Sequence, residues 1–217
     1  IVVVDPGKIP TRPVSPRILL NTVLATMVGL VVAGGIVFLM ESLDDTIKTP
    51  DDIERVFELP ILGTIGRLSD LEKPQDQVVT AHHPRSRTSE AYRVLRTNVQ
   101  FSTIGNPDGL LLVTSTGPLE GKTTTSANLA VTMAQDGHRV ILVDSDLRRP
   151  ALHKLFALHN RLGFSDLIVN DELPLETALQ TTEVQGLEVL TSGRLPPNPA
   201  ELLGSERTQR LLHSLQE

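Results

Sequence analysis

The middle of the sequence holds a stretch whose residue types could hold a phosphate, TGPLEGKTTTSANLA at residues 116–130. Its Gly-Lys-Thr matches the end of the pattern G-x-x-x-x-G-K-[ST], whereas a threonine stands at the first glycine position. In such a loop the glycine lets the backbone approach an anion, the lysine reaches the β- and γ-phosphates, and the hydroxyl is offered to Mg²⁺. We therefore expect a nucleotide site formed by Thr116, Gly117, Glu120, Gly121, Lys122, Thr123 and Thr124.

Two aspartates follow the next apolar run, in RVILVDSDLRRP at residues 139–150. Asp144 and Asp146 come at the carboxyl end of an expected inner strand, and that edge of an open α/β sheet faces the ligand. One carboxylate there can hold Mg²⁺, and another can accept a proton from an attacking hydroxyl. Capping of the following helix by one of them is the alternative.

Strands and helices around both motifs would position them. GLLLVTS at residues 109–115 predicts a strand before the loop, and TTTSANLAVTMAQDG at residues 123–137 predicts a helix after it. HRVILVD at residues 138–144 predicts a second strand. Apolar runs that alternate with helices indicate a parallel sheet covered on both faces, so we predict an α/β fold of the P-loop NTPase type.

A helix is expected just before this region, in TSEAYRVLRTNVQFSTI at residues 88–104. Its apolar side chains at helical spacing predict a buried face formed by Ala91, Leu95, Val99 and Phe101 or Ile104.

An uncharged run at residues 18–40 is long enough to cross a membrane, because 23 residues span about 35 Å as a helix. The proline-rich residues 1–17 read as an extended connector. Residues 41–88 read as a juxtamembrane region, with a helix capped by Thr49, a short strand in PILGTI at residues 60–65 and a linker at residues 67–88. The Lys and Arg count faintly favours a cytoplasmic N-terminal side, but a nucleotide site requires residues 41–217 to be cytoplasmic.

Composition limits the other functions. The net charge of −6 disfavours general nucleic-acid binding, which depends on Lys and Arg neutralising phosphates. The absence of cysteine excludes disulfides and thiolate metal sites.

Taken together, the motifs resemble those of the bacterial tyrosine kinases (BY-kinases). GKTTTSANLA is similar to their phosphate loop, ILVDSDLRRP to their Walker A′ motif, and SEAYRVLRTN to their E-x-x-R-x-x-R helix. GFSDLI and GRLPPNPAELLGS also match segments usual in that family. Residues near the start, with PVSPR and DDTIKTPDDIE, resemble the end of a chain-length-determinant (Wzz-like) polysaccharide co-polymerase.

The resemblance implies an inner-membrane, ATP-dependent tyrosine autokinase that governs the polymerisation and export of capsular or extracellular polysaccharide. It implies ATP and Mg²⁺ as cofactors and catalytic roles for Lys122, Asp144 and Asp146, with Thr123 and Asp144 at the metal. It also implies a ring-forming homo-oligomer, an octamer in the family, joined through Glu90, Arg93 and Arg96, although a solvated charged face is the alternative for that helix. The implied partners are the polysaccharide polymerase and export machinery and a tyrosine phosphatase.

Two parts of the family pattern, Walker B and a C-terminal tyrosine cluster, are not found in the sequence. We expect the chain to be a piece of a longer protein, with residues 89–217 the N-terminal part of the kinase domain, and to be inactive alone. Two other functions stay open: a partitioning-type P-loop ATPase, which usually carries an extra lysine where this chain has Gly117, and a non-catalytic co-polymerase scaffold.

Overall fold

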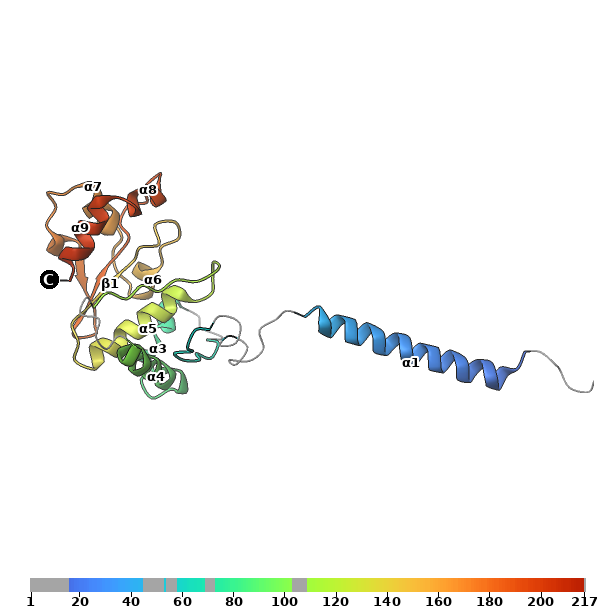
Figure 1. The fold of residues 1–217 in the computed structure, drawn as a ribbon. Helices are drawn as coiled ribbons and strands as arrows, with labels where there is room; N and C mark the ends of the chain where they lie inside the picture. The colour runs from blue at the N-terminus through green and yellow to red at the C-terminus, as the bar shows by residue number, and fades with distance from the viewer. Residues whose placement is uncertain (1–15, 45–52, 54–57, 69–72, 103–108, 217) are drawn as a thin grey trace, which may run out of the picture. The chain divides into compact units, whose positions relative to one another are not determined.

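The computed structural model describes residues 16–44, 53, 58–68, 73–102 and 109–216. The chain divides into two compact units, residues 1–60 and residues 61–217, which are considered separately (Figure 1). The expected helix capped by Thr49 and the connector at residues 1–15 lie outside the described residues.

The first unit contains one long helix, α1 (Ile18–Ser42), which confirms the helix expected at residues 18–40. Its side chains are exposed on every side, and the hydroxyls of Thr22 and Thr26 donate to backbone carbonyls one turn earlier. Among the described residues it is the helix whose length and composition would suit a bilayer. Its 25 residues span about 37 Å.

The second unit is built on a sheet of three short strands in the order β1-β3-β2. Strand β1 (Val140–Val143) pairs in parallel with β3 (Leu187–Leu190), and β2 (Leu179–Thr181) pairs antiparallel with β3. The β1–β3 pair has the expected parallel arrangement, whereas β2 makes the sheet mixed.

Helices cover both faces of this sheet, as predicted. One face packs on α5 (Lys122–Gln135), whose apolar residues 127, 130, 131 and 134 follow helical spacing and meet Leu187 and Val189 of β3. Leu190 of β3 belongs to the other cluster, which includes Phe164 and Ile168 of α7 (Phe164–Val169) and reaches α9 (Glu206–Ser214). Each fully buried aliphatic side chain contributes about 2 kcal/mol. The remaining short elements are α6 (Leu152–Leu155), η2 (Leu175–Thr177) and α8 (Pro199–Leu203).

Helix α4 (Arg87–Ser102) confirms the helix expected at residues 88–104, and it packs along α5 (Figure 1). Its buried side chains are Ser89, Tyr92 and Val99. Phe101 is 68% exposed, so its predicted place on the buried face is wrong, and Ile104 lies outside the described residues.

The region expected to be a linker at residues 67–88 is folded where it is described. Residues 73–88 contain η1 (Pro74–Gln77) and α3 (Val79–His82), and Val78, Val79 and Thr80 are buried within the second unit. The linker prediction is therefore wrong for these residues. Polar composition misled it, because the Asn128 side chain of α5 satisfies the backbone N–H of Thr80 and the backbone carbonyl of Gln77.

Two predicted strands do not form. Residues 60–65 form no ladder with any described strand, and the Asn98 amide donates to the Leu62 carbonyl. Residues 109–115 also have no ladder partner among the described residues, and Leu110, Leu111 and Leu112 are exposed. A strand needs a neighbour for its backbone groups, and local propensity does not supply one.

Candidate functional site

The phosphate loop leads directly into α5, as its sequence predicts. Gly121 precedes the helix with φ of 85°, a backbone conformation that glycine adopts without steric cost. Its carbonyl then accepts the first helical hydrogen bond, from the Thr125 N–H at 2.8 Å. The free N–H groups of the first turn therefore face the loop, where the helix dipole favours an anion.

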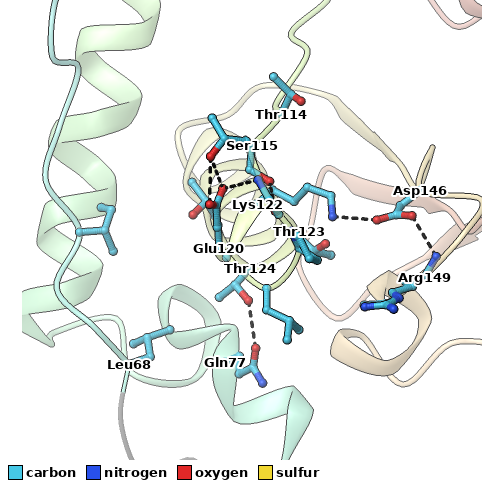
Figure 2. Close-up of a pocket in the computed structure, with 18 of the residues that line it drawn as sticks. Leu68, Gln77, Thr114, Ser115, Glu120, Lys122, Thr123, Thr124, Asp146 and Arg149 are labelled. Atoms are coloured by element: carbon cyan, nitrogen blue, oxygen red, sulfur yellow. Dashed lines mark hydrogen bonds and ion pairs between the residues drawn. The ribbon is translucent and has the colours of Figure 1, made fainter. Parts of the chain in front are cut away.

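A pocket of about 1150 Å³ opens at this helix end (Figure 2). Its wall is made by the loop from Thr114 to Thr125, by Asp146, Arg148 and Arg149 after β1, and by residues 65–68 with Gln77 and Tyr92. The volume suits a nucleotide-sized ligand. The two motifs singled out in the sequence thus share one cavity.

An ion pair joins the two motifs directly. The Lys122 Nζ lies 2.7 Å from Asp146 Oδ2, and Asp146 Oδ1 accepts hydrogen bonds from the Arg148 and Arg149 N–H groups (Figure 2). Partial burial would raise the pKa of Asp146, but the hydrogen bonds from Lys122 and from the two backbone N–H groups outweigh it and hold the pKa below its ordinary value. Asp146 is therefore an ionised partner for the lysine at neutral pH.

Asp144 has a different setting, because its carboxylate is buried under the chain that follows β1. Oδ2 accepts from the Ala151 and Leu152 N–H groups, and Oδ1 accepts from the Asp146 N–H. Burial raises the pKa of this carboxyl, and those backbone hydrogen bonds oppose the rise. Asp144 is absent from the pocket wall. It shapes the turn that carries Asp146, and as many as three N–H groups depend on it.

The hydroxyls of the first helical turn point in different directions. Thr123 lines the pocket, as expected for a residue that offers its oxygen to a metal. Thr124 also lines the pocket, but its hydroxyl donates to Gln77 Oε1 at 2.9 Å (Figure 2). Gln77 was missed in the sequence because it lies in the supposed linker and belongs to no motif.

Residues at the start of the loop are hydrogen-bonded to one another. The Glu120 carboxylate accepts from the Gly117 N–H at 2.9 Å and from the Thr116 hydroxyl at 3.0 Å. These two hydrogen bonds, the backbone one first, hold the pKa of Glu120 below its ordinary value. Each of the loop residues expected at the nucleotide lines the pocket, but these three also bind one another.

The donor set near the loop fits a magnesium ion that is held together with phosphate. The described residues include no group of three or more His, Cys, Asp or Glu that could hold a metal on their own. Mg²⁺ in phosphoryl-transfer sites usually takes only one or two protein ligands and completes its shell with water and phosphate oxygens. Thr123 and Asp146, both on the pocket wall, meet that requirement.

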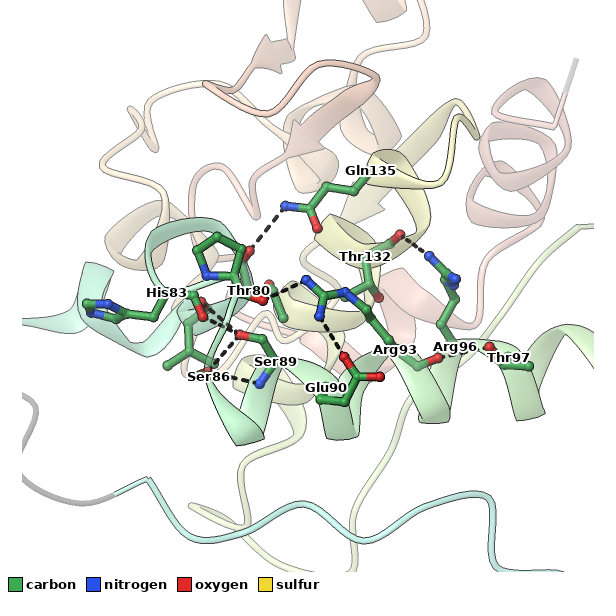
Figure 3. A network of polar contacts seen from close by, with 12 residues as sticks. Thr80, His83, Ser86, Ser89, Glu90, Arg93, Arg96, Thr97, Thr132 and Gln135 are labelled. Carbon is green, nitrogen blue, oxygen red and sulfur yellow. Dashed lines mark hydrogen bonds and ion pairs between the residues drawn. The ribbon is translucent and has the colours of Figure 1, made fainter.

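Of the charged residues Glu90, Arg93 and Arg96 on α4, only some lie at the surface, where another molecule could bind them (Figure 3). Arg93 pairs with Glu90 at 2.7 Å and donates to the Pro84 carbonyl, and this pair lies at the surface. Arg96 instead turns inward, donates to the Thr132 carbonyl of α5 and pairs with Asp136 at 3.1 Å. Glu90 and Arg93 are therefore available to a neighbour, while Arg96 ties α4 to α5.

Comparison with known proteins gives one consistent family. Residues 111–217 match the CobQ/CobB/MinD/ParA nucleotide binding domain. The chain is 42% identical over 139 residues to the tyrosine-protein kinase YwqD of Bacillus subtilis (strain 168), which covers 64% of this chain and 58% of that protein. It is 31% identical over 223 residues to the tyrosine-protein kinase ptk of Acinetobacter johnsonii, covering 99% of this chain and 30% of that protein.

The similar solved structures include a tyrosine kinase domain, in agreement with the names of the curated relatives. The BceF tyrosine kinase domain superposes with a TM-score of 0.69 at 33% identity, covering 78% of this chain and 72% of that one. The chain spans 58% and 30% of the lengths of the two curated relatives above.

Proposed function

We propose that this chain is a bacterial tyrosine-protein kinase, as its curated relatives and the solved domain that superposes on it are named, and that its site serves ATP-dependent phosphorylation of tyrosine. The observation that carries the proposal is the 2.7 Å contact between Lys122 and Asp146, because it brings both motifs into a single nucleotide-sized pocket. Phosphoryl transfer is catalysed mainly by positioning and by electrostatic stabilisation, which this arrangement can supply.

Within this proposal Lys122 neutralises the β- and γ-phosphates, and the N–H groups at the start of α5 hold the phosphate chain. Lys122 must then share its charge between phosphate and Asp146. Asp146, ionised at neutral pH, holds the Lys122 ammonium at the pocket through its ion pair.

Mg²⁺ when bound would neutralise charge on the phosphate oxygens. We assign its protein ligands to Thr123 and Asp146, which line the pocket. The sequence-based assignment of Asp144 to the metal or to catalysis stays a prediction. Its three backbone hydrogen bonds support a positioning role, in which it fixes the turn that carries Asp146.

The acceptor tyrosine is proposed to be none of the residues of this sequence. Tyr92 is the single tyrosine of the sequence, and it is 1% exposed in α4. Burial raises the pKa of its hydroxyl, and a hydrogen bond with Thr125 opposes that rise. A side chain held in this way is a poor acceptor for phosphoryl transfer, which supports placing the acceptor elsewhere.

Location and partners follow from the same resemblance. We propose that α1 anchors the protein in the bacterial inner membrane with residues 41–217 in the cytoplasm. The resemblance also supports a ring-forming oligomer, a role in polysaccharide export with its polymerase machinery, and a phosphatase that removes the phosphate. The exposed Glu90–Arg93 pair supports the oligomer contact.

The test is a phosphotyrosine blot on the protein as its gene encodes it, with and without Lys122→Met. Loss of the phosphoryl-holding charge should lower phosphotyrosine by about a hundredfold or more. The matched control is Lys154→Met, because Lys154 is an exposed lysine on α6. Phosphotyrosine that persists in Lys122→Met would overturn the catalytic assignment.

A partitioning-type ATPase is the second candidate, because the matched domain family includes MinD and ParA. Release of phosphate from ATP without any phosphotyrosine, and dependent on Lys122, would favour this function over the kinase.

A further inference from the structure

The start of the phosphate loop has two features that nucleotide binding does not explain. Thr116 stands where the pattern has a glycine, although a bulkier residue hinders close approach to phosphate. Leu119, at the tip of the loop, has a φ of 66° and is 97% exposed. A leucine in this left-handed region is strained, and such strain persists only when surrounding contacts fix the backbone.

Glu120 supplies those contacts. Its carboxylate reaches back across the loop and accepts from the Gly117 N–H at 2.9 Å, while the Thr116 hydroxyl lies 3.0 Å and 3.1 Å from its two oxygens. The contact with Gly117 is close, because a Cβ there would lie 3.1 Å from Glu120 Oε1 and the carboxylate would have to shift by a few tenths of an ångström. The hydrogen bonds close a turn whose tip is the strained Leu119.

We infer that Glu120 is a positioning residue that braces the phosphate loop through Thr116 and Gly117, and is not itself a ligand of the nucleotide. The inference rests on the proposed nucleotide site. A carboxylate repels phosphate, so direct contact with the ligand would weaken binding. Turned back onto the loop, the same carboxylate lowers the conformational freedom that nucleotide binding would otherwise have to remove.

The brace also accounts for the departure at the first position of the motif. Glycine has no side-chain donor, whereas the Thr116 hydroxyl gives Glu120 a second hydrogen bond. Thr116 should therefore lose its effect when Glu120 is removed, whereas Glu120 keeps its hydrogen bond with the Gly117 N–H when Thr116 is removed.

The pair is tested by binding of a fluorescent ATP analogue with Mg²⁺ to the full chain. Glu120→Ala and Thr116→Val should each raise the Kd about three- to tenfold, as expected when modest hydrogen bonds are lost. The double variant should be no weaker than the worse single one. Glu120→Gln should recover part of the affinity, because its amide oxygen still accepts from the Gly117 N–H. The matched control is Glu183→Ala, at an exposed glutamate.

A second readout needs no nucleotide. In the NMR spectrum the Gly117 amide proton should shift with pH as the Glu120 carboxyl titrates, below the ordinary range for glutamate, and this response should vanish in Glu120→Gln. If the chemical shift of the Gly117 amide proton does not change with pH, the positioning role of Glu120 is refuted. Binding by Glu120→Ala that equals or exceeds the wild type also overturns it, since the carboxylate would then be neutral or a competitor of phosphate. If the wild type binds no nucleotide, the proposed function fails. The amide titration still tests whether Glu120 holds the loop, because it needs no nucleotide.

Discussion

Asn128→Ala should destabilise the second unit more than any exposed substitution, because the Asn128 side chain joins α5 to the segment before α4. Asn128 is fully buried. Its Oδ1 accepts from the Thr80 N–H at 3.0 Å and the Thr80 hydroxyl at 2.9 Å. Its Nδ2 donates to the Gln77 and Thr124 carbonyls, both at 2.8 Å.

The magnitude follows from the groups that the alanine leaves behind. The buried Thr80 N–H loses its partner, which costs about 2 kcal/mol, and the partly buried Gln77 carbonyl adds about 1 kcal/mol. The Thr80 hydroxyl keeps a longer contact with the Asn128 carbonyl, and the Thr124 carbonyl stays in the α5 helix, so neither adds much. The sum is about 3 kcal/mol, or about 6–12 °C in melting temperature for a unit of this size.

The assay is thermal melting of the full chain in detergent micelles, followed by far-UV circular dichroism. Hydrogen exchange at residues 73–82 should speed up in the same variant, because these residues lose their tie to α5. The control is Asn170→Ala, at an exposed asparagine whose Oδ1 accepts only from the Glu172 N–H in the described structure. Equal melting temperatures for the two variants would refute the stabilising role of Asn128. Residues 73–82 would then be better described as a linker.

Other variants separate the roles of the charged residues. Lys122→Met should weaken ATP-analogue binding by at least tenfold, measured by fluorescence titration, since it removes the one lysine of the loop. Arg96→Ala should lower the melting temperature, because Arg96 holds α5, whereas Arg93→Ala should leave it nearly unchanged and instead reduce oligomer size in analytical ultracentrifugation. The pKa of Asp146 is lowered on folding, so its ionised form stabilises the protein above the ordinary aspartate pKa of about 3.9 and this stabilisation is lost as pH falls through the lower folded value. The stability gap between wild type and Asp146→Asn, measured by urea unfolding, should therefore narrow in acid.

Much of the site could be predicted because the residues of the phosphate loop are neighbours in the sequence. Gly121, Lys122 and Thr123 are adjacent in sequence, and the helix pattern at residues 123–137 placed them at a helix start. Asp146 was predicted at the ligand-facing edge of the sheet, from the rule that ligands bind at the carboxyl ends of parallel strands, whereas its ion pair with Lys122 was not predicted. The long apolar helix was equally readable, because a run of uncharged residues is a property of composition alone.

The errors arose where a side chain or strand depends on distant partners. The leucines at residues 110–112 have strand propensity but no ladder partner among the described residues, so they stay exposed. Residues 73–82 looked like a polar linker until Asn128, about fifty positions later, supplied their hydrogen bonds. The interface role expected for Arg96 stays a prediction, but only the folded chain showed that its side chain also binds the Thr132 carbonyl of α5.

By itself, the sequence determined the kind of chemistry, since a Gly-Lys-Thr loop and two strand-end aspartates specify which groups meet a phosphate. Only the tertiary structure decided which of these groups face the pocket. It buried Asp144 beneath backbone N–H groups, left Asp146 beside Lys122, and turned Glu120 onto its own loop. Residue type and spacing fix a side chain's chemical capacity, whereas its direction and its partners are set by packing between segments far apart in the chain.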